Sequence, residues 1–170
     1  ELRQGAFFIE IEAEDNVVEY VETRLVKDKL IIEMDDDVKL KTEIPAKVYL
    51  SMPSLEFVEV SEASSLSSKT VMRNEEIRIE AIEAAKANFI LDCKVLRVNM
   101  DGSADLRNTG YAVKQVIKMQ GATNYDAHLL NSEEIDIAAG SGAKAEILSH
   151  GKIFGDLSEA AKCSYYGEPK

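Results

Sequence analysis

A stretch of sequence recurs about every twenty residues from residue 54 onward, and this repeat limits the possible fold more than any other feature. When the copies are aligned, the residues equivalent to Leu106 form one column. Successive residues of this column are 21, 19, 19, 20 and 18 positions apart in the sequence. The residues of this column are Leu66, Ala87, Leu106, Tyr125, Ala145 and Cys163. Because a period of this size is typical of stacked repeats, we expect each copy to contact mainly its neighbours.

Further columns keep their chemical character from copy to copy. A β-branched column precedes a second apolar column by two residues, and two adjacent columns hold only small residues. The β-branched column is Val58, Ile79, Val98, Ile117 and Ile137, and Gly155 takes this place in the last copy. The second apolar column is Val60, Ala81, Met100, Met119 and Ala139, and Leu157 takes this place in the last copy. The small columns are Ala63, Ala84, Ser103, Ala122, Gly142 and Ala160, then Ser64, Ala85, Ala104, Thr123, Ala143 and Ala161.

These columns predict an all-β fold, a parallel β-solenoid. Spacing of two indicates strands, and β-branched residues suit strands that stack about 4.8 Å apart. Small residues indicate a tight corner, where glycines 102, 121, 140 and 142 allow positive φ, while Glu62 and Glu83 stand at the glycine position of the first copies. A leucine-rich repeat would show LxxLxL, and a helical repeat would space apolar residues by three and four. The segment 80–86 has helix propensity, but the repeat register overrides it.

The N-terminal part, residues 1–53, reads as strands and a hairpin that cap the solenoid, and residues 54–170 as its repeats, in one structural unit. Residues 7–13 alternate, which predicts a half-buried strand with Phe7, Ile9 and Ile11 on its apolar side. Residues 15 and 16 are candidate caps of a short helical turn. Residues 23–34 predict a hairpin with a polar tip at 27–29, and another strand is expected at 48–52.

Charge and composition exclude several classes of partner. The net charge is −11, from 20 basic and 31 acidic residues, which argues against nucleic acid and against an anionic membrane surface. No apolar run approaches the length of a membrane-spanning helix. The first five residues do not resemble a signal peptide. Tryptophan is absent and aromatic residues make up 6%, so a stacking platform for bases or sugars is poorly supplied.

Cysteine and histidine spacing predicts neither a metal site nor a cofactor. No CxxC pair is present, and His128 and His150 fall outside any HExxH motif. Cys163 belongs to the inward Leu106 column and Cys93 to another part of its rung, so we do not expect a disulfide. Residues 35–37 are three aspartates without the spacing of a calcium loop, which favours a solvated turn over a weak ion site.

No catalytic residue is predicted either. His128 follows Asp126 closely enough to act as a base, but no nucleophile elbow accompanies it, so a surface position is expected. A polysaccharide lyase needs carboxylates and a basic residue on one outer face. The candidates for such a face are Asp92, Asp101, Asp105, Lys94 and Arg97. Since acidic and basic residues interleave on the surface of any soluble solenoid, these residues give lyase chemistry little support.

Four aromatic residues are the best candidates for contact with a partner: Tyr111, Phe154, Tyr165 and Tyr166. Tyrosine is favoured at interfaces because it buries a large area at low entropic cost. The alternative for residues 165 and 166 is that they cover the open end of the last rung.

Several segments together resemble a known family. They are the corner 101–106 with weaker copies at 121–123 and 140–142, the lead-in at 48–55 and the ending at 165–170. These resemble the putative auto-transporter adhesin, head GIN domain proteins common in Bacteroidetes. The resemblance implies a right-handed single-stranded parallel β-helix, export to the cell surface, outer membrane or periplasm, a role in adhesion and assembly into a homotrimer.

Three functions remain open from the sequence. The first is a non-catalytic adhesin whose repeated face binds a host or cell-surface glycan or protein. The second is a structural or oligomerisation scaffold of the cell envelope, which a stable trimer without ligand binding would favour. The third is a polysaccharide-active enzyme on a pectin-lyase-like helix, which would require measured turnover.

Overall fold

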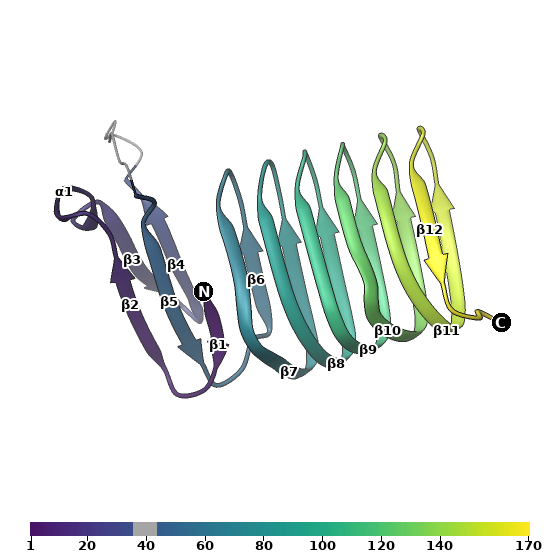
Figure 1. The fold of residues 1–170 in the computed structure, drawn as a ribbon, viewed down its shortest axis with the longest axis horizontal. Helices are drawn as coiled ribbons and strands as arrows, with labels where there is room; N and C mark the ends of the chain where they lie inside the picture. The colour runs from purple at the N-terminus through teal and green to yellow at the C-terminus, as the bar shows by residue number, and fades with distance from the viewer. Residues whose placement is uncertain (36–43) are drawn as a thin grey trace.

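The computed structural model describes residues 1–35 and 44–170, and strands dominate it (Figure 1). The aspartates at 36 and 37 lie outside the described residues. The elements are β1 (Leu2–Gln4), β2 (Phe8–Glu12), α1 (Asp15–Val18), β3 (Val21–Val26), β4 (Lys29–Met34), β5 (Lys47–Met52), β6 (Phe57–Val60), β7 (Ser65–Ala81), β8 (Lys86–Met100), β9 (Asp105–Met119), β10 (Asn124–Ala139), β11 (Lys144–Leu157) and β12 (Lys162–Tyr166).

Strands β6 to β12 stack in parallel, which confirms the predicted solenoid (Figure 1). Each strand pairs with the strand one rung away, and the pairing register is the one that the repeat columns predict. The β-branched column forms a continuous file of direct partners, Val58, Ile79, Val98, Ile117 and Ile137. The Leu106 column likewise runs through Leu66, Ala87, Leu106, Tyr125, Ala145 and Cys163.

Each long strand contributes to two walls that enclose the core. In β8 every second side chain is buried along most of the strand, among them Phe89, Leu91, Leu96 and Val98. Successive side chains of a strand point to opposite sides, so alternate residues face the core, and the buried positions shift by one residue between Cys93 and Leu96. In Figure 1 each rung turns sharply at one end and bends broadly at the other. The apolar side chains of adjacent rungs therefore form one continuous core.

The sharp corners share a left-handed backbone position. Its residues and φ values are Glu62 (57°), Glu83 (60°), Gly102 (78°), Gly121 (82°), Ser141 (52°) and Glu159 (50°). A Cβ at Gly121 would lie 2.4 Å from the carbonyl oxygen of Gly102, so the stacking itself requires glycine there. The prediction for Gly140 was wrong: Ser141 and Gly142 carry the positive φ values in that corner.

The N-terminal strands join the stack through β1. This strand lies between β5 and β7 and runs parallel to both, while β2 pairs antiparallel with β5. The predicted hairpin is confirmed as β3 and β4, and the predicted helical turn as α1, although Glu14 is its N-cap. The predicted half-buried strand was wrong for Phe7 and Ile9, which are 82% and 43% exposed: Phe7 precedes β2, and in β2 only Ile11 is partly buried.

A hydrogen-bonded polar network crosses the interior between two rungs. Asn108 and Gln115 come from β9, and Tyr125 and Ser132 from β10, and all four are buried. Asn108 donates to the Tyr125 hydroxyl (3.3 Å), which donates to Gln115 Oε1 (2.7 Å). The Gln115 amide nitrogen then donates to Ser132 Oγ (2.7 Å). Buried polar groups need such partners because an unpaired group keeps its full desolvation penalty.

The cysteines lie in different parts of their rungs. Cys93 is buried, Cys163 is half-buried against the core, and both thiols are free. Burial raises the pKa of the Cys93 thiol to about 11.

Over residues 1–35 and 44–170, no helix has the length and apolar character needed to cross a bilayer.

Candidate functional site

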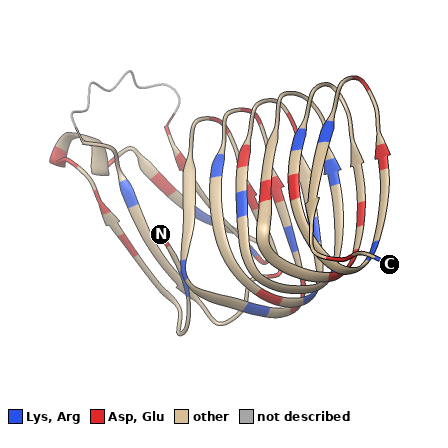
Figure 2. Ribbon diagram, turned by 45° about the vertical axis from the view of Figure 1, so that its right-hand side comes forward, with Lys and Arg blue, Asp and Glu red and all other residues tan. Residues whose placement is uncertain are grey.

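Several charged side chains on the outer faces of the solenoid pair with opposite charges on neighbouring rungs. Figure 2 shows basic and acidic residues interspersed over adjacent strands. Three of the residues that the sequence offered for lyase chemistry have separate partners: Asp92 pairs with Arg73, Lys94 with Glu75 and Arg97 with Glu76. Asp101 accepts a hydrogen bond from the backbone of Gly102 at its corner. These side chains therefore do not converge on one point where a substrate could react.

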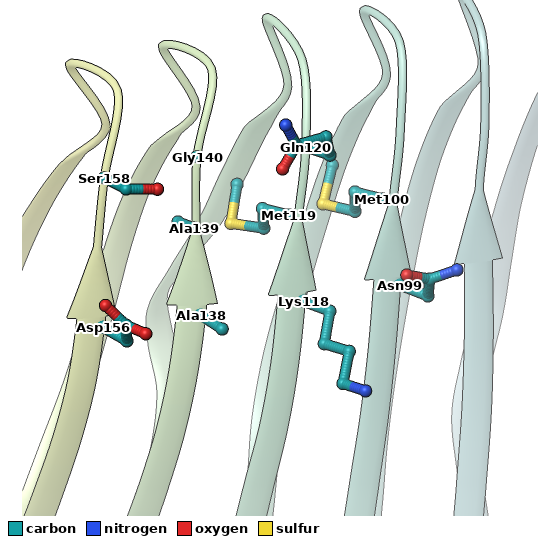
Figure 3. A pocket seen from close by; sticks show the side chains of 10 residues that line it. All are labelled: Asn99, Met100, Lys118, Met119, Gln120, Ala138, Ala139, Gly140, Asp156 and Ser158. Atoms are coloured by element: carbon teal, nitrogen blue, oxygen red, sulfur yellow. The ribbon is translucent and has the colours of Figure 1, made fainter.

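A shallow depression crosses one wall near the sharp corners, with a volume of about 280 Å³ (Figure 3). It spans β8 to β11, and its lining includes Met100, Met119, Lys118 and Asp156. Ligand pockets usually enclose about 300–1,000 Å³ and bring several polar groups together. The depression is smaller and offers a few spread-out polar groups, so it is a weak candidate for an active site.

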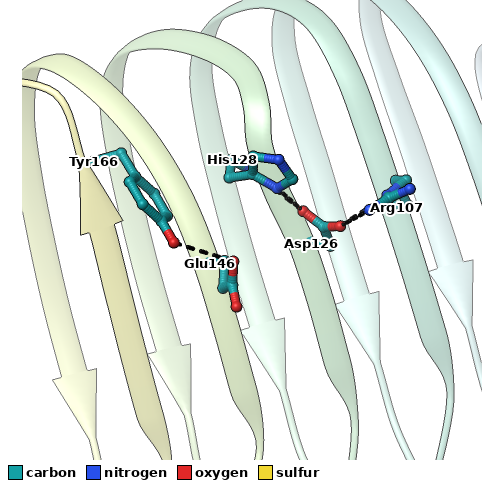
Figure 4. A network of polar contacts seen from close by, with 5 residues as sticks. All are labelled: Arg107, Asp126, His128, Glu146 and Tyr166. Atoms are coloured by element: carbon teal, nitrogen blue, oxygen red, sulfur yellow. Dashed lines mark hydrogen bonds and ion pairs between the residues drawn. The ribbon is translucent and has the colours of Figure 1, made fainter.

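A denser polar cluster lies on the outer wall of the last rungs (Figure 4). It consists of Arg107, Asp126, His128, Glu146 and Tyr166, and we call it the Asp126 cluster. Arg107 donates from Nε to Asp126 Oδ2 at 2.7 Å, and His128 Nδ1 contacts Asp126 Oδ1. The hydroxyl of Tyr166 donates to Glu146 Oε2 at 3.4 Å. The ring of Tyr166 lies against that of His128, with centroids 6.1 Å apart.

Strand register places the charged members of this cluster side by side. Asp126 on β10 pairs directly with Arg107 on β9 and with Glu146 on β11. His128 lies two residues beyond Asp126, at the point where β10 leaves the register of both neighbours. Relative to β11, the residues 128–130 are extra, since Ala127 and Asn131 pair with consecutive residues of β11. Such bulges are common near functional sites because they redirect side chains.

The contacts within the cluster shift two pKa values. Burial of the Asp126 carboxyl opposes ionisation, but hydrogen bonds from His128 and Arg107 outweigh it, so its pKa lies below the ordinary value. The negative charge of Glu146 is the main cause of the raised pKa of the Tyr166 phenol. At neutral pH the cluster therefore holds an ionised Asp126 and a protonated Tyr166.

The four aromatic residues predicted for partner contact occupy different places. Tyr166 is 47% exposed and belongs to the Asp126 cluster. Tyr165 is exposed on β12, the last strand of the stack, and Phe154 is exposed on the second half of β11. Tyr111 is half-buried in β9, and its hydroxyl donates to Glu133 Oε1 at 2.8 Å.

The sequence did not point to Arg107 and Glu146, and it predicted only a surface position for His128, with Asp126 as its neighbour. The repeat alignment does contain a signal for three of these residues. The repeat alignment places Arg107, Asp126 and Glu146 two residues after Asp105, Asn124 and Lys144, and hence in one outward column. The position of His128 depends on the bulge in β10, for which the repeat gives no indication.

Solved structures with the same fold include three from Bacteroidetes. An adhesin described as putative from Bacteroides fragilis aligns with a TM-score of 0.78 at 15% identity, over 99% of this chain and 85% of that one. Putative adhesins from Parabacteroides distasonis (TM-score 0.60) and Parabacteroides merdae (0.52) align at 13% identity, each over 99% of this chain and over 86% and 87% of theirs. No curated protein matches the chain.

A family model covers nearly the whole sequence. The match extends over residues 1–169, which includes the N-terminal strands as well as every rung. The structural neighbours agree with it in fold. The chain therefore belongs to the family described as putative auto-transporter adhesin, head GIN domain.

Proposed function

We propose that this protein is an exported, non-catalytic adhesin that binds a glycan or protein of the host or cell surface with the outer wall of its solenoid. Membership of an adhesin family supports export and contact with an external partner. The observation that carries the proposal is the Asp126 cluster, in which charged, hydrogen-bonding and aromatic side chains share an open wall. Aromatic and arginine side chains often dominate the energy of such interfaces.

Three of the predicted aromatic contacts keep a place in this proposal. Tyr166 stands within the Asp126 cluster, and Tyr165 and Phe154 are exposed on the last rungs. A partner that lies along this end of the solenoid would reach these side chains without entering a cleft. Tyr111 contributes less, because it is half-buried in β9.

The experiment is a binding screen with the intact exported protein against glycans and matrix proteins, combined with an assay for polysaccharide cleavage. Saturable binding to a panel member without cleavage is the expected result. Measured turnover of a polysaccharide would contradict the proposal and favour the enzyme.

A scaffold that oligomerises is the second candidate, and one observation favours it. Strand β12 covers β11 along 144–148, and among the described residues no strand pairs with the outer side of 152–157. Unpaired strand edges invite pairing with another chain. Static light scattering tests this candidate: a stable homotrimer that binds nothing in the screen would favour the scaffold over the adhesin.

A further inference from the structure

Three side chains of metal-ligating type converge in the Asp126 cluster. One ligand atom from each of Asp126, His128 and Glu146 lies within 4.8 Å of the other two. We propose that these residues form a binding site for one divalent transition-metal ion, and that Zn²⁺ fits their ligand chemistry best. The site stands on these three side chains alone and is independent of whether the wall binds an adhesion partner.

The backbone already holds the ligands on one face. Asp126 and Glu146 are direct partners on adjacent strands, and His128 is on the same strand as Asp126 (Figure 4). The Nδ1 atom of His128 faces Oδ1 of Asp126, so an ion can replace the proton between them. Ligation therefore requires side-chain rotation and no change in the strand pairing.

The ligand atoms lie within 4.8 Å of one another, so the side chains must move closer together to hold a metal ion. Ligands at about 2.0–2.2 Å from a tetrahedral zinc lie about 3.3 Å from one another. Glu146 is exposed and its carboxylate can approach, since its hydrogen bond from Tyr166 is long, at 3.4 Å. Two carboxylates and one imidazole offset the charge of a divalent ion and leave a fourth position open to solvent. A water molecule or an oxygen atom of a partner can occupy that position.

The imidazole of His128 determines which class of cation fits the site. Calcium and magnesium are hard cations that prefer oxygen ligands, so the imidazole nitrogen of His128 disfavours both. Zinc and its neighbours in the first transition row accept nitrogen and oxygen together. Arg107 holds the second oxygen of Asp126 at 2.7 Å and orients the carboxylate, but its positive charge opposes a cation nearby.

The test is calorimetric titration of the full chain with ZnCl₂ and, separately, CaCl₂. His128→Ala and Glu146→Gln remove ligands, and Arg107→Gln removes the opposing charge. Two variants are matched controls. His150→Ala removes an exposed histidine elsewhere on β11, and Glu133→Gln alters a carboxylate that also accepts a hydrogen bond from a tyrosine.

The proposal predicts one zinc site per chain. His128→Ala and Glu146→Gln should each weaken zinc binding by at least about tenfold, and the control variants by no more than about twofold. Arg107→Gln should tighten it. Calcium should bind more weakly and respond little to His128→Ala. Absence of saturable zinc binding up to about 1 mM, or wild-type affinity in both ligand variants, overturns the proposal. If circular dichroism shows that His128→Ala does not fold, the isosteric Glu146→Gln decides.

Discussion

The hydroxyl of Tyr125 donates a hydrogen bond of 2.7 Å to Gln115 Oε1 across the interior of the solenoid. Gln115 stands in a file of apolar residues on the neighbouring rungs, next to Leu96 and Ile135. The polar pair therefore connects the two walls of the solenoid at a position where the neighbouring rungs have apolar side chains. Its removal tests how much the network stabilises the fold.

Replacing Tyr125 by phenylalanine should destabilise the protein by about 1–3 kcal/mol. The change removes one oxygen atom and leaves Gln115 Oε1 and the Asn108 amide without partners in a buried site. Denaturant unfolding measures the loss. Tyr111→Phe is the control, since its hydrogen bond to Glu133 is on the outer face and should be worth less than about 1 kcal/mol. Equal effects of the two changes would contradict the assigned role of the network.

Replacing Glu83 by glycine should stabilise the protein by up to about 1 kcal/mol. Glu83 has a φ of 60°, and left-handed backbone costs a non-glycine residue about 1–2 kcal/mol, which exceeds the added entropy of glycine in the unfolded chain. Thermal unfolding measures the gain. Lys118→Gly is the control: the same change within strand β9 should destabilise the protein by about 0.5–1 kcal/mol.

Replacing Gly121, which lies two corners after Glu83, by alanine should destabilise the protein. In Gly121→Ala the new Cβ would lie 2.4 Å from the Gly102 carbonyl oxygen, and φ is 82°. We expect a loss of at least about 2 kcal/mol, because both strain and a backbone clash must be relieved. An unchanged unfolding midpoint would mean that the corners are not stacked this closely.

Stability should fall as pH rises above about 9, and Cys93 should cause the first part of the loss. Burial raises the pKa of Cys93 from 9.0 to about 11, so the native state favours the neutral thiol. Its contribution is present below pH 9 and is lost as pH rises to 11, by at most about 3 kcal/mol. Burial also raises the pKa of Tyr125, so a further decline should follow above pH 10.

The measurement is the free energy of unfolding from pH 8 to pH 11 for the wild type and Cys93→Ala. The variant should lose less stability over this interval, whatever its stability at pH 8. Cys163→Ala is the control, because Cys163 is half-buried at the end of the stack and should change the slope less. Parallel curves for the wild type and Cys93→Ala would contradict burial of the thiol.

The repeat predicted the fold because a solenoid stacks equivalent positions. The columns that begin at Val58, Val60 and Leu66 became files of paired residues, and even the degenerate last copy at Gly155 and Leu157 kept the register. The placement of β1 between β5 and β7 did not follow from the repeat, because it joins residues near 2 and 68 through non-local pairing. The division at residues 53 and 54 stays a prediction.

The Asp126 cluster was predictable only in part. Column arithmetic places Arg107, Asp126 and Glu146 together, but charged columns also occur on faces that serve solubility alone. The three extra residues at 128–130 depend on how β10 meets β11, where Ala127 and Asn131 pair with consecutive residues, and no local pattern encodes this. The buried Gln115 could have been noticed as a polar residue in an apolar column.

The central claim is that the wall around the Asp126 cluster is the contact surface of an adhesin. The most direct measurement compares two double variants for binding to the panel member that the wild type binds. His128→Ala/Tyr166→Ala alters this wall, and Lys118→Ala/Asp156→Ala alters the depression near the corners. The account predicts that the first variant loses about tenfold or more in affinity and the second stays within about twofold. Unchanged binding by the first variant and loss by the second would contradict it.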